Sequence, residues 1–309
     1  NGSVNQTITT GGVGTGNDFY NLTIANTGSP ADPLDVETSG AIKVIATLDV
    51  ADGQFMPATS SEFLDVTVSA SDGILKPATS SSITVSGNWS DASGTFTPNS
   101  GTVVMDGTSK TIATGASNEF YNLTIDGTVT TSTSNDVNVQ NLLTVNSSKT
   151  LTVSPGDVMT LEDATVTGTL TVDATGSSAT LDFSTATNAV LSVTGTIRLD
   201  GNSSNRAIVV SDDGSRIAFS VTTNGIFNAD YATISYCDGN GVNITGGGTQ
   251  VISNVTFDYP PSSGTLLKVS SATDLPTEIS GCIFGTTAGL NGISSPTNVT
   301  ADGTTDVVT

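Results

Sequence analysis

One eight-residue segment occurs twice in this chain. Asn118–Ile125 repeats Asn17–Ile24 with a single change, Asp to Glu at the second position. In both copies apolar and polar residues alternate, which predicts a β-strand with one face inward and one outward. A chain that repeats one strand about a hundred residues later is predicted to stack similar units, and such stacks build long structures rather than enclosed pockets.

The repeat extends beyond this segment. Gln6–Gly11 matches Lys110–Gly115, but the strand pattern Thr102–Gly107, which precedes the second copy, has no counterpart before the first. The sequence Asp306–Thr309, followed head to tail by the start of another copy, resembles Thr102–Gly107. We therefore expect the C-terminus of one chain to complete the N-terminus of the next, at an interface of Asn1, Gly2, Ser3, Asp306, Val307, Val308 and Thr309. The alternative is chance similarity among short strands rich in Val, Thr and Gly.

The composition predicts an all-β protein. The chain has 309 residues, is 36% hydrophobic and contains 33 glycines; Thr and Ser exceed a quarter of it, and no stretch shows a helical period. Residues 136–200 repeat short Leu-Thr-Val strands between turns every eight to twelve residues. That spacing is typical of a sandwich, a barrel or a solenoid, and the near-identical strands favour a solenoid.

Charge excludes some classes of partner. The net charge is −21, with 8 Lys plus Arg and no His. Nucleic-acid binding needs a basic face, and anionic membranes also repel such a chain. No apolar run has the length of a membrane-spanning helix, so we expect no membrane insertion. Low Lys, abundant Thr, Ser and Asn, and a start at Asn1 rather than Met predict an extracellular product whose leader was removed, or a segment of a longer polypeptide.

The last third carries a family resemblance. Ile234–Cys237, Ile252–Phe257 and Ile279–Phe284 align, with spacings of 18 and 27 residues. They resemble the coils of right-handed parallel β-helix proteins of the pectate-lyase-like class. Gly87–Ile125 is similar to repeats of large bacterial and archaeal β-helical surface proteins.

The resemblance implies an elongated right-handed parallel β-helix over residues 1–309, with coils of about twenty residues. It would divide into a repeat pair at 1–130, a ladder of short strands at 131–220 and pectate-lyase-like coils at 221–309. A small sandwich in the first hundred residues is the alternative, since four prolines interrupt that region: Pro30, Pro33, Pro57 and Pro77.

The alignment also bears on the two cysteines. Cys237 and Cys282 occupy equivalent places in it, with Val255 between them, and would lie two coils and about 10 Å apart. We expect buried free thiols; a disulfide is the alternative if the Ile252 coil does not intervene.

Candidate chemistry is sparse. The family's lyases use an Arg base with calcium, and the three arginines Arg198, Arg206 and Arg216 lie near Asp212 and Asp213. They could equally pair with neighbouring aspartates, and triads that need His are excluded. Calcium is the one metal that carboxylates in turns would suit, but no calcium-loop pattern is present, so we expect turn-capping aspartates and no cofactor. The acidic groups are Asp212 with Asp213, Asp32 with Asp35, Asp230 and Asp238.

The chain also contains ten Asn-x-Ser/Thr triplets, more than the six or seven that this composition gives by chance, and each is a candidate N-glycosylation site. They begin at Asn1, Asn5, Asn21, Asn88, Asn122, Asn146, Asn202, Asn243, Asn254 and Asn298. The structural alternative is that these triplets are parts of strands, because a strand with a polar outer face has the same alternation of polar and apolar residues.

Together these observations predict a structural protein rather than an enzyme. We expect a subunit of an extracellular fibre whose partners are other copies, head to tail, and glycans. The alternative is an adhesin or a passenger segment of a longer surface protein. A polysaccharide-degrading β-helix enzyme is a third and weaker hypothesis.

Overall fold

The computed structural model describes ten stretches of the chain, and every structural statement below concerns them: residues 5–14, 16–26, 35–132, 136–183, 188–211, 215–245, 250–259, 265–269, 278–284 and 297–301. All of their regular structure is β-strand. The strands form coils of a right-handed parallel β-helix, which confirms the predicted fold class. The chain divides into two compact units, 1–141 and 142–309, and each is described by itself.

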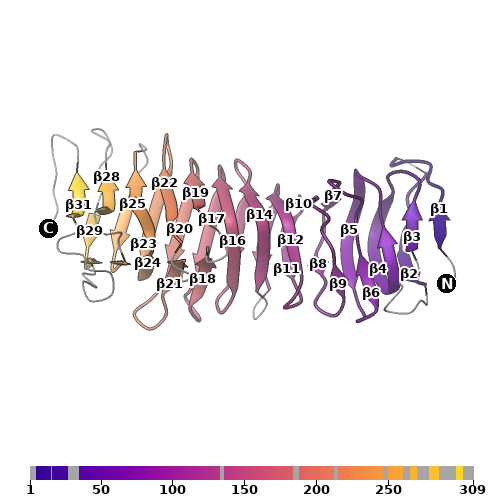
Figure 1. Cartoon of the computed structure of the whole chain (residues 1–309), viewed down its shortest axis with the longest axis horizontal. Helices are drawn as coiled ribbons and strands as arrows, with labels where there is room; N and C mark the ends of the chain where they lie inside the picture. Colours follow the sequence, from indigo (N-terminus) through magenta and orange to yellow (C-terminus); the bar gives the residue numbers. More distant parts are fainter. Residues whose placement is uncertain are drawn as a thin grey trace. The chain divides into compact units, whose positions relative to one another are not determined.

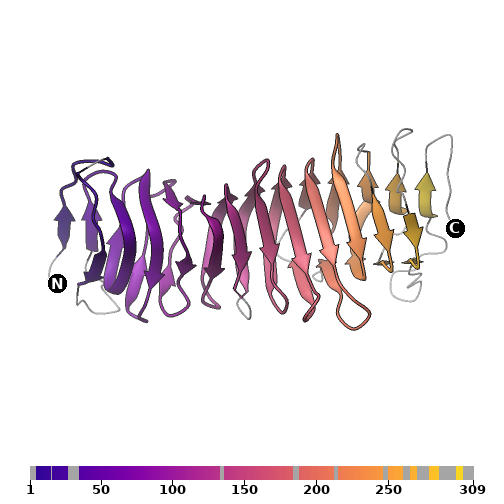
Figure 2. The same ribbon diagram turned by 180° about the vertical axis from the view of Figure 1, so that it is seen from behind.

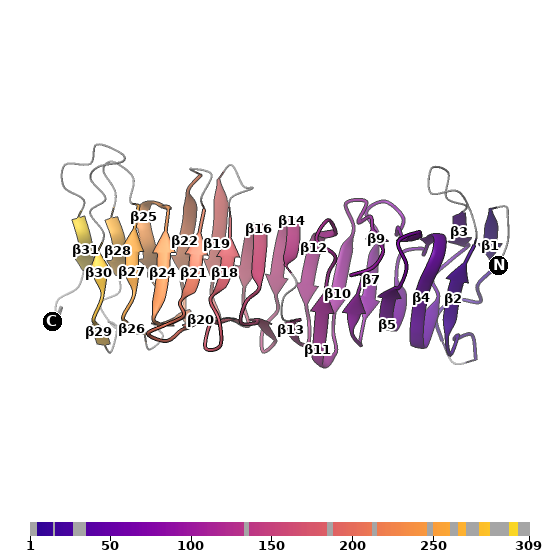
Figure 3. The same ribbon diagram turned by 90° about the horizontal axis from the view of Figure 1, so that it is seen from below.

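Unit 1 is a stack of coils whose described strands pair in parallel. Figures 1, 2 and 3 show its strands in indigo to magenta. They are β1 (Gln6–Ile8), β2 (Leu22–Ala25), β3 (Asp35–Thr38), β4 (Lys43–Met56), β5 (Ser61–Val68), β6 (Gly73–Leu75), β7 (Ser82–Val85), β8 (Trp89–Ser90), β9 (Thr95–Phe96), β10 (Thr102–Met105), β11 (Thr108–Ala113), β12 (Glu119–Ile125) and β13 (Thr128–Thr131); β14 (Val137–Val145) crosses the boundary of the units.

Each coil of unit 1 has three strand faces. Face A stacks β1, β3, the end of β4, β6 and β9. Face B stacks the starts of β4 and β5 with β7, β10 and the second half of β12. Face C begins with β2, the middle of β4, the end of β5, β8 and the end of β11. On face B, Val85 pairs with Met105 and Met105 with Ile125, so one coil here is twenty residues long, as predicted.

The two copies of the duplicated segment do not occupy equivalent places. Leu22 pairs with Leu48 on face C, whereas Leu123 pairs with Val103 on face B. The same segment therefore lies on face C in its first copy and on face B in its second. The inference that the first copy lacks a strand possessed by the second was wrong, because it assumed equivalent coils. The reason is physical: all three faces impose the same alternation, so one motif fits any of them. The terminal residues of the predicted junction lie outside the described residues, and the junction itself stays a prediction.

The prolines of unit 1 mark a corner rather than a sandwich. Phe55, Leu75 and Phe96 lie in register on face A, and each is followed two residues later by a proline: Pro57, Pro77 and Pro98. Proline lacks an N–H, so it suits the position where a strand ends and the chain turns. The sandwich alternative was therefore wrong for Pro57 and Pro77, while Pro30 and Pro33 lie outside the described residues.

The core of unit 1 contains an aromatic cluster. The Trp89 ring lies 4.8 Å from Phe96 and 5.2 Å from Phe120, centroid to centroid, and Trp89 is fully buried. One corner is closed by glycine: a Cβ on Gly127 would lie 2.0 Å from the carbonyl oxygen of Gly107 in the coil before. Only a residue without a side chain permits that approach.

Unit 2 continues the same plan with longer and less regular coils. Its strands are β15 (Thr150–Val153), β16 (Val158–Val166), β17 (Thr169–Asp173), β18 (Ala179–Asp182), β19 (Ala189–Val193), β20 (Thr196–Asp200), β21 (Ala207–Val210), β22 (Ile217–Val221), β23 (Ile226–Asp230), β24 (Ala232–Ser235), β25 (Cys237–Ile244), β26 (Val251–Ser253), β27 (Thr256–Asp258), β28 (Thr265–Val269), β29 (Glu278–Ser280), β30 (Ile283–Phe284) and β31 (Thr297–Ala301). Leu170 pairs with Ile197 and Ile197 with Phe227, so these coils span 27 and 30 residues.

The predicted alignment of the last third is right for two segments and wrong for one. Ile252 pairs with Ile279, as expected. Ile234 pairs instead with Phe257, and the residue that pairs with Ile252 is Ala229. The prediction matched the Ile-Ser dipeptides and so aligned strands that lie on different faces. Both faces contain a buried apolar residue next to an outward polar one. The subdivision at 130 and 220 stays a prediction.

Candidate functional site

A polar surface of unit 2 is built by β20, β23 and β26, which pair in parallel. Two rows of side chains point outward. Arg198, Asn228 and Val251 form one row, and Asp200 and Asp230 belong to the other. Together with Ala229 these five residues line a hollow of about 220 Å³. We call this hollow and its lining the Arg–Asp surface.

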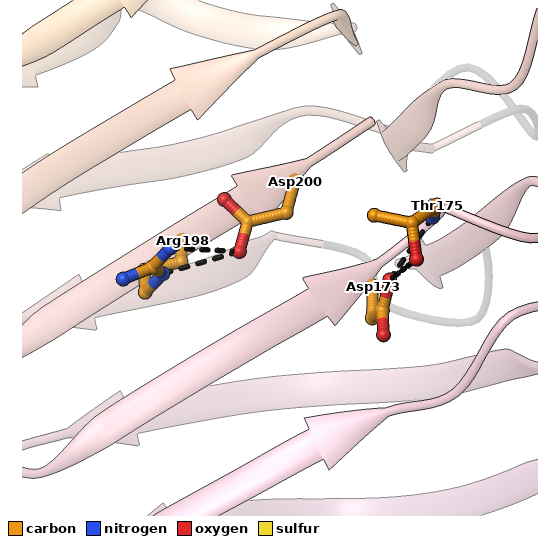
Figure 4. A network of polar contacts seen from close by, with 4 residues as sticks. All are labelled: Asp173, Thr175, Arg198 and Asp200. Carbon is orange, nitrogen blue, oxygen red and sulfur yellow. Dashed lines mark hydrogen bonds and ion pairs between the residues drawn. The ribbon is translucent and has the colours of Figure 1, made fainter. Parts of the chain in front are cut away.

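Each carboxylate of the second row already has a partner. The guanidinium of Arg198 contacts Asp200 at 3.0 Å; Asp173, which pairs with Asp200 from the coil before, accepts from the backbone N–H and hydroxyl of Thr175 at 3.0 and 2.7 Å (Figure 4). Asp230 accepts from the Ser253 hydroxyl at 2.7 Å and from the Asn254 side chain at 3.0 Å.

These carboxylates do not form a metal centre. Among the described residues, no group of three or more His, Cys, Asp or Glu side chains could hold a metal ion. Asp238 accepts from the backbone N–H of Asn240 at 2.8 Å, as a turn-capping aspartate does. Asp35 accepts from the side chain of Gln54. Asp32, Asp212 and Asp213 lie outside the described residues.

The other two arginines hold corners of the β-helix. Arg206 donates to the carbonyl oxygens of Ala232 at 2.9 Å and Asn254 at 2.6 Å, and so joins its own coil to the next two. Arg216 donates to the carbonyl oxygens of Cys237 and Tyr259. The prediction allowed these arginines to pair with aspartates; among the described residues they bond instead to backbone carbonyls, and Arg206 also to the hydroxyls of Thr233 and Thr256. Carbonyls at a corner face away from the strand ladder and need such donors.

A stacked tyrosine pair lies beside Arg216. The rings of Tyr236 and Tyr259 are parallel, with centroids 4.6 Å apart, and Arg216 lies 5.5 Å from the Tyr236 ring centre. Both tyrosines have left-handed backbone conformations, with φ of 63° and 51°, which a bulky residue rarely adopts. Sequence reasoning missed this corner. The sequence contained one signal for it: a Tyr that follows Ser or Asp at the end of a strand recurs one coil later.

Both cysteines are free, as expected, but only Cys237 is buried: Cys282 is half-buried, and the predicted alignment of the two was wrong. Cys237 belongs to β25 and pairs with Ile217, whereas Cys282 lies one coil beyond Val255 on another part of the coil. Burial raises the pKa of the Cys237 thiol to about 12, with Asp238 adding to the effect, and burial also raises the pKa of Cys282. Neither thiol is therefore set up as a nucleophile.

The candidate glycosylation sites differ in exposure and bonding. The side chains of Asn5, Asn21 and Asn88 are exposed. The amide nitrogen of Asn202 donates to the carbonyl of Thr175 at 2.8 Å, and that of Asn254 donates to Asp230. Asn122, Asn146 and Asn243 are half-buried, while Asn1 and the side chain of Asn298 lie outside the described residues.

A buried acid in unit 1 was not anticipated from the sequence. Asp91 is fully buried; its Oδ1 accepts from the backbone N–H of Gly115 at 3.0 Å, and its own carbonyl accepts from Asn118 at 2.8 Å. Burial raises the pKa of Asp91 to about 6, and the indole N–H of Trp89 opposes only part of that rise. Neither Asp91 Oδ2 nor that indole N–H completes a hydrogen bond.

Comparison with known proteins identifies no relative: no family model, no curated protein and no solved structure matches the chain. The described residues contain no helix that is long and apolar enough to cross a membrane.

Proposed function

We propose that this chain is a structural β-solenoid of an extracellular surface protein. The observation that carries the proposal is how the polar side chains are used. Arg206 joins three coils, and Asn118 binds the carbonyls of Asp91 and Gly94 in the coil before its own. Residue types that carry chemistry in enzymes are engaged here in fastening one coil to the next, which suits a structural protein.

An extracellular location is supported by composition. A chain with 8 Lys plus Arg, 29 Asp plus Glu and no His has a strongly acidic surface that stays soluble at high salt. The likeness of its repeats to those of β-helical surface proteins points the same way. Localisation is tested by fractionating the source cells: recovery of the protein in the cytosolic fraction alone contradicts the proposal.

The fibre hypothesis extends this proposal to assembly. Among the described residues, β1 pairs with β3 and β2 pairs with β4, each on one side. A hollow of about 300 Å³ lies among β1, β2 and Val36, and Ile8, Leu22 and Ile24 belong to its lining. A further β-helical coil would fill that hollow and continue the ladders, and we propose that the coil comes from another copy, end to end.

Electron microscopy and light scattering of the purified chain at high concentration test the assembly. We expect filaments, and we expect Thr23→Pro to abolish them, because proline removes an N–H from the open edge. Thr23→Ser is the matched control. Monomers alone at every concentration contradict the fibre. A mature mass far above 31 kDa would instead favour a passenger segment of a longer protein.

Glycosylation is proposed at the exposed asparagines. We expect glycans at Asn5, Asn21 and Asn88 in the native protein, because their side chains are exposed. We expect none at Asn202 or Asn254, whose amide nitrogens donate hydrogen bonds within the fold. Mass spectrometry of peptides from the native source checks each site, and modification of Asn202 or Asn254 alone contradicts the reasoning.

A further inference from the structure

The Arg–Asp surface keeps unused acceptors after its internal contacts are counted. Asp200 receives both of its contacts from the guanidinium of Arg198 at Oδ2, so its Oδ1 has no partner among the described residues (Figure 4). Asp230 accepts from Ser253 and Asn254 at Oδ1 alone, which leaves its Oδ2 without a partner in the same part of the chain. Two carboxylate oxygens on neighbouring strands can therefore accept hydrogen bonds from a ligand.

Unused donors lie beside these acceptors. The side-chain oxygen of Asn228 accepts from the backbone N–H of Val251 at 3.2 Å, while its amide nitrogen donates to no described residue. Arg198 is 50% exposed and uses Nε and one terminal nitrogen on Asp200, so its other terminal nitrogen is left to donate. Arg198 and Asn228 are register partners, about 4.8 Å apart. The hollow thus presents donors in one row and acceptors in the next.

The charge around the hollow is negative. Arg198 lies in it, and Arg206 is held at the nearby corner by the carbonyl of Asn254. Four acids stand in the hollow or in register with its lining: Asp173, Asp200, Asp230 and Glu278. An anionic ligand is therefore repelled. A cationic ligand is attracted by the acids, but it meets the guanidinium of Arg198 and leaves the donors unpaired, which lowers its affinity.

We propose that the Arg–Asp surface binds an uncharged sugar. Each hydroxyl of a pyranose both donates and accepts, so one ring can donate to Asp200 and Asp230 while it accepts from Asn228 and Arg198. Val251, 38% exposed at the hollow, offers an apolar contact to the C–H groups of the ring. The volume of about 220 Å³ is smaller than that of sites for drug-sized ligands, and it suits one sugar residue rather than a long chain.

Ligand-detected NMR of the purified chain tests the preference for an uncharged sugar. The probes are glucose, mannose and galactose, each beside its uronate and its 2-amino derivative, which carry a negative and a positive charge on the same ring. We expect saturable binding of at least one hexose, with its uronate bound about tenfold more weakly or not at all and its amino sugar bound no more tightly. Binding of none of the hexoses, or tighter binding of a charged derivative, overturns the proposal.

Substitutions locate the site. Asn228→Asp keeps the oxygen that accepts from Val251 but removes the amide donors, and Asp230→Asn replaces a free acceptor by a donor. We expect each to weaken binding of the hexose about tenfold or more, because a polar group of the sugar is left unpaired. Asp173→Asn makes the same change of charge one coil outside the hollow, and it should leave binding unchanged. Equal weakening by Asp173→Asn contradicts the site.

A measurement on the unsubstituted chain covers variants that fail to fold. The side-chain amide signal of Asn228 should shift in a ¹⁵N spectrum as the hexose is added, and a signal that does not move while the sugar binds places binding elsewhere and refutes the proposal. The site lies on β20, β23 and β26 of one chain, so it does not depend on assembly. Filaments formed by a chain that binds no sugar would refute this proposal alone and leave the structural role standing.

Discussion

Acidification is expected to stabilise unit 1, and Asp91 is the cause. The carboxyl has an ordinary pKa of 3.8 and a folded-state pKa of about 6. A raised pKa means that the folded state binds the proton more tightly than the unfolded state. Stability contributed by this group is therefore lost as the pH rises from about 4 to 6, and the loss is complete above that window.

The magnitude follows from the shift. About two pKa units correspond to about 3 kcal/mol, and between pH 4 and pH 7.5 roughly 2 kcal/mol of that should be observable. The other carboxylates, among 29 Asp plus Glu, also titrate in this range. The informative quantity is therefore the difference between the wild type and Asp91→Asn at each pH. Any constant effect of the amide on the local hydrogen bonds cancels in that comparison.

The assay uses the chain's one tryptophan. Trp89 is fully buried two residues from Asp91, so its fluorescence during urea unfolding reports this part of unit 1. We expect Asp91→Asn to gain roughly 2 kcal/mol relative to the wild type between pH 4 and pH 7.5. The exposed Asp72→Asn is the matched control. A difference that does not change with pH would refute the argument, as would an NMR titration that places the Asp91 carboxyl near 4.

Three further outcomes follow from the described contacts. Arg206→Ala should lower the free energy of unfolding in urea by about 1.5–3 kcal/mol, because its charge-assisted hydrogen bonds to carbonyls are lost. Arg198→Ala, whose ion pair is half exposed, should lower it by less than about 1 kcal/mol. Equal effects of the two substitutions would contradict the assignment. In a Cys282→Ala chain, Cys237 should resist a thiol reagent at pH 8 until urea is added, since burial raises its pKa to about 12, and fast labelling of that native chain would contradict its burial. Gly195→Ala should lower the free energy of unfolding by about 1–3 kcal/mol, because its Cβ would lie 2.1 Å from the carbonyl oxygen of Gly168, and a neutral effect would show that the corner can open.

The fold was predictable from the sequence because the strands of a β-solenoid are determined by local sequence features. Alternation in segments such as Thr150–Val153 gives the strand, and β-branched residues favour it. Which face each strand occupies was not predictable from the same rules. Leu22 and Leu123 have the same neighbours in sequence but pair on different faces, because the face depends on how many residues each preceding corner consumes. Repetition therefore indicated the architecture and misassigned the register.

Site features were less accessible to sequence reasoning. Arg206 and Arg216 were singled out as catalytic candidates or partners of aspartates, but they bond to main-chain carbonyls, and Arg206 also to the hydroxyls of Thr233 and Thr256, which no residue pattern displays. The raised pKa of Asp91 depends on complete burial at a corner, and the segment Trp89–Asp91 does not distinguish that environment from an exposed turn. The stacking of Tyr236 on Tyr259 could be predicted only after the strand register was known, because it requires that this coil be 23 residues long.

The glycine corner of unit 1 has a consequence for how such chains change length. Gly107 and Gly127 are separated by twenty residues, as are Met105 and Ile125 on the strand beside them. Removal of the twenty residues between two such glycines would join equivalent points of successive coils and keep the twenty-residue step of face B, whereas the bulge between Thr108 and Lys110 makes the step from Ile112 to Thr131 nineteen residues on face C. The length of this part of the molecule is therefore expected to change in steps of about one coil rather than one residue at a time.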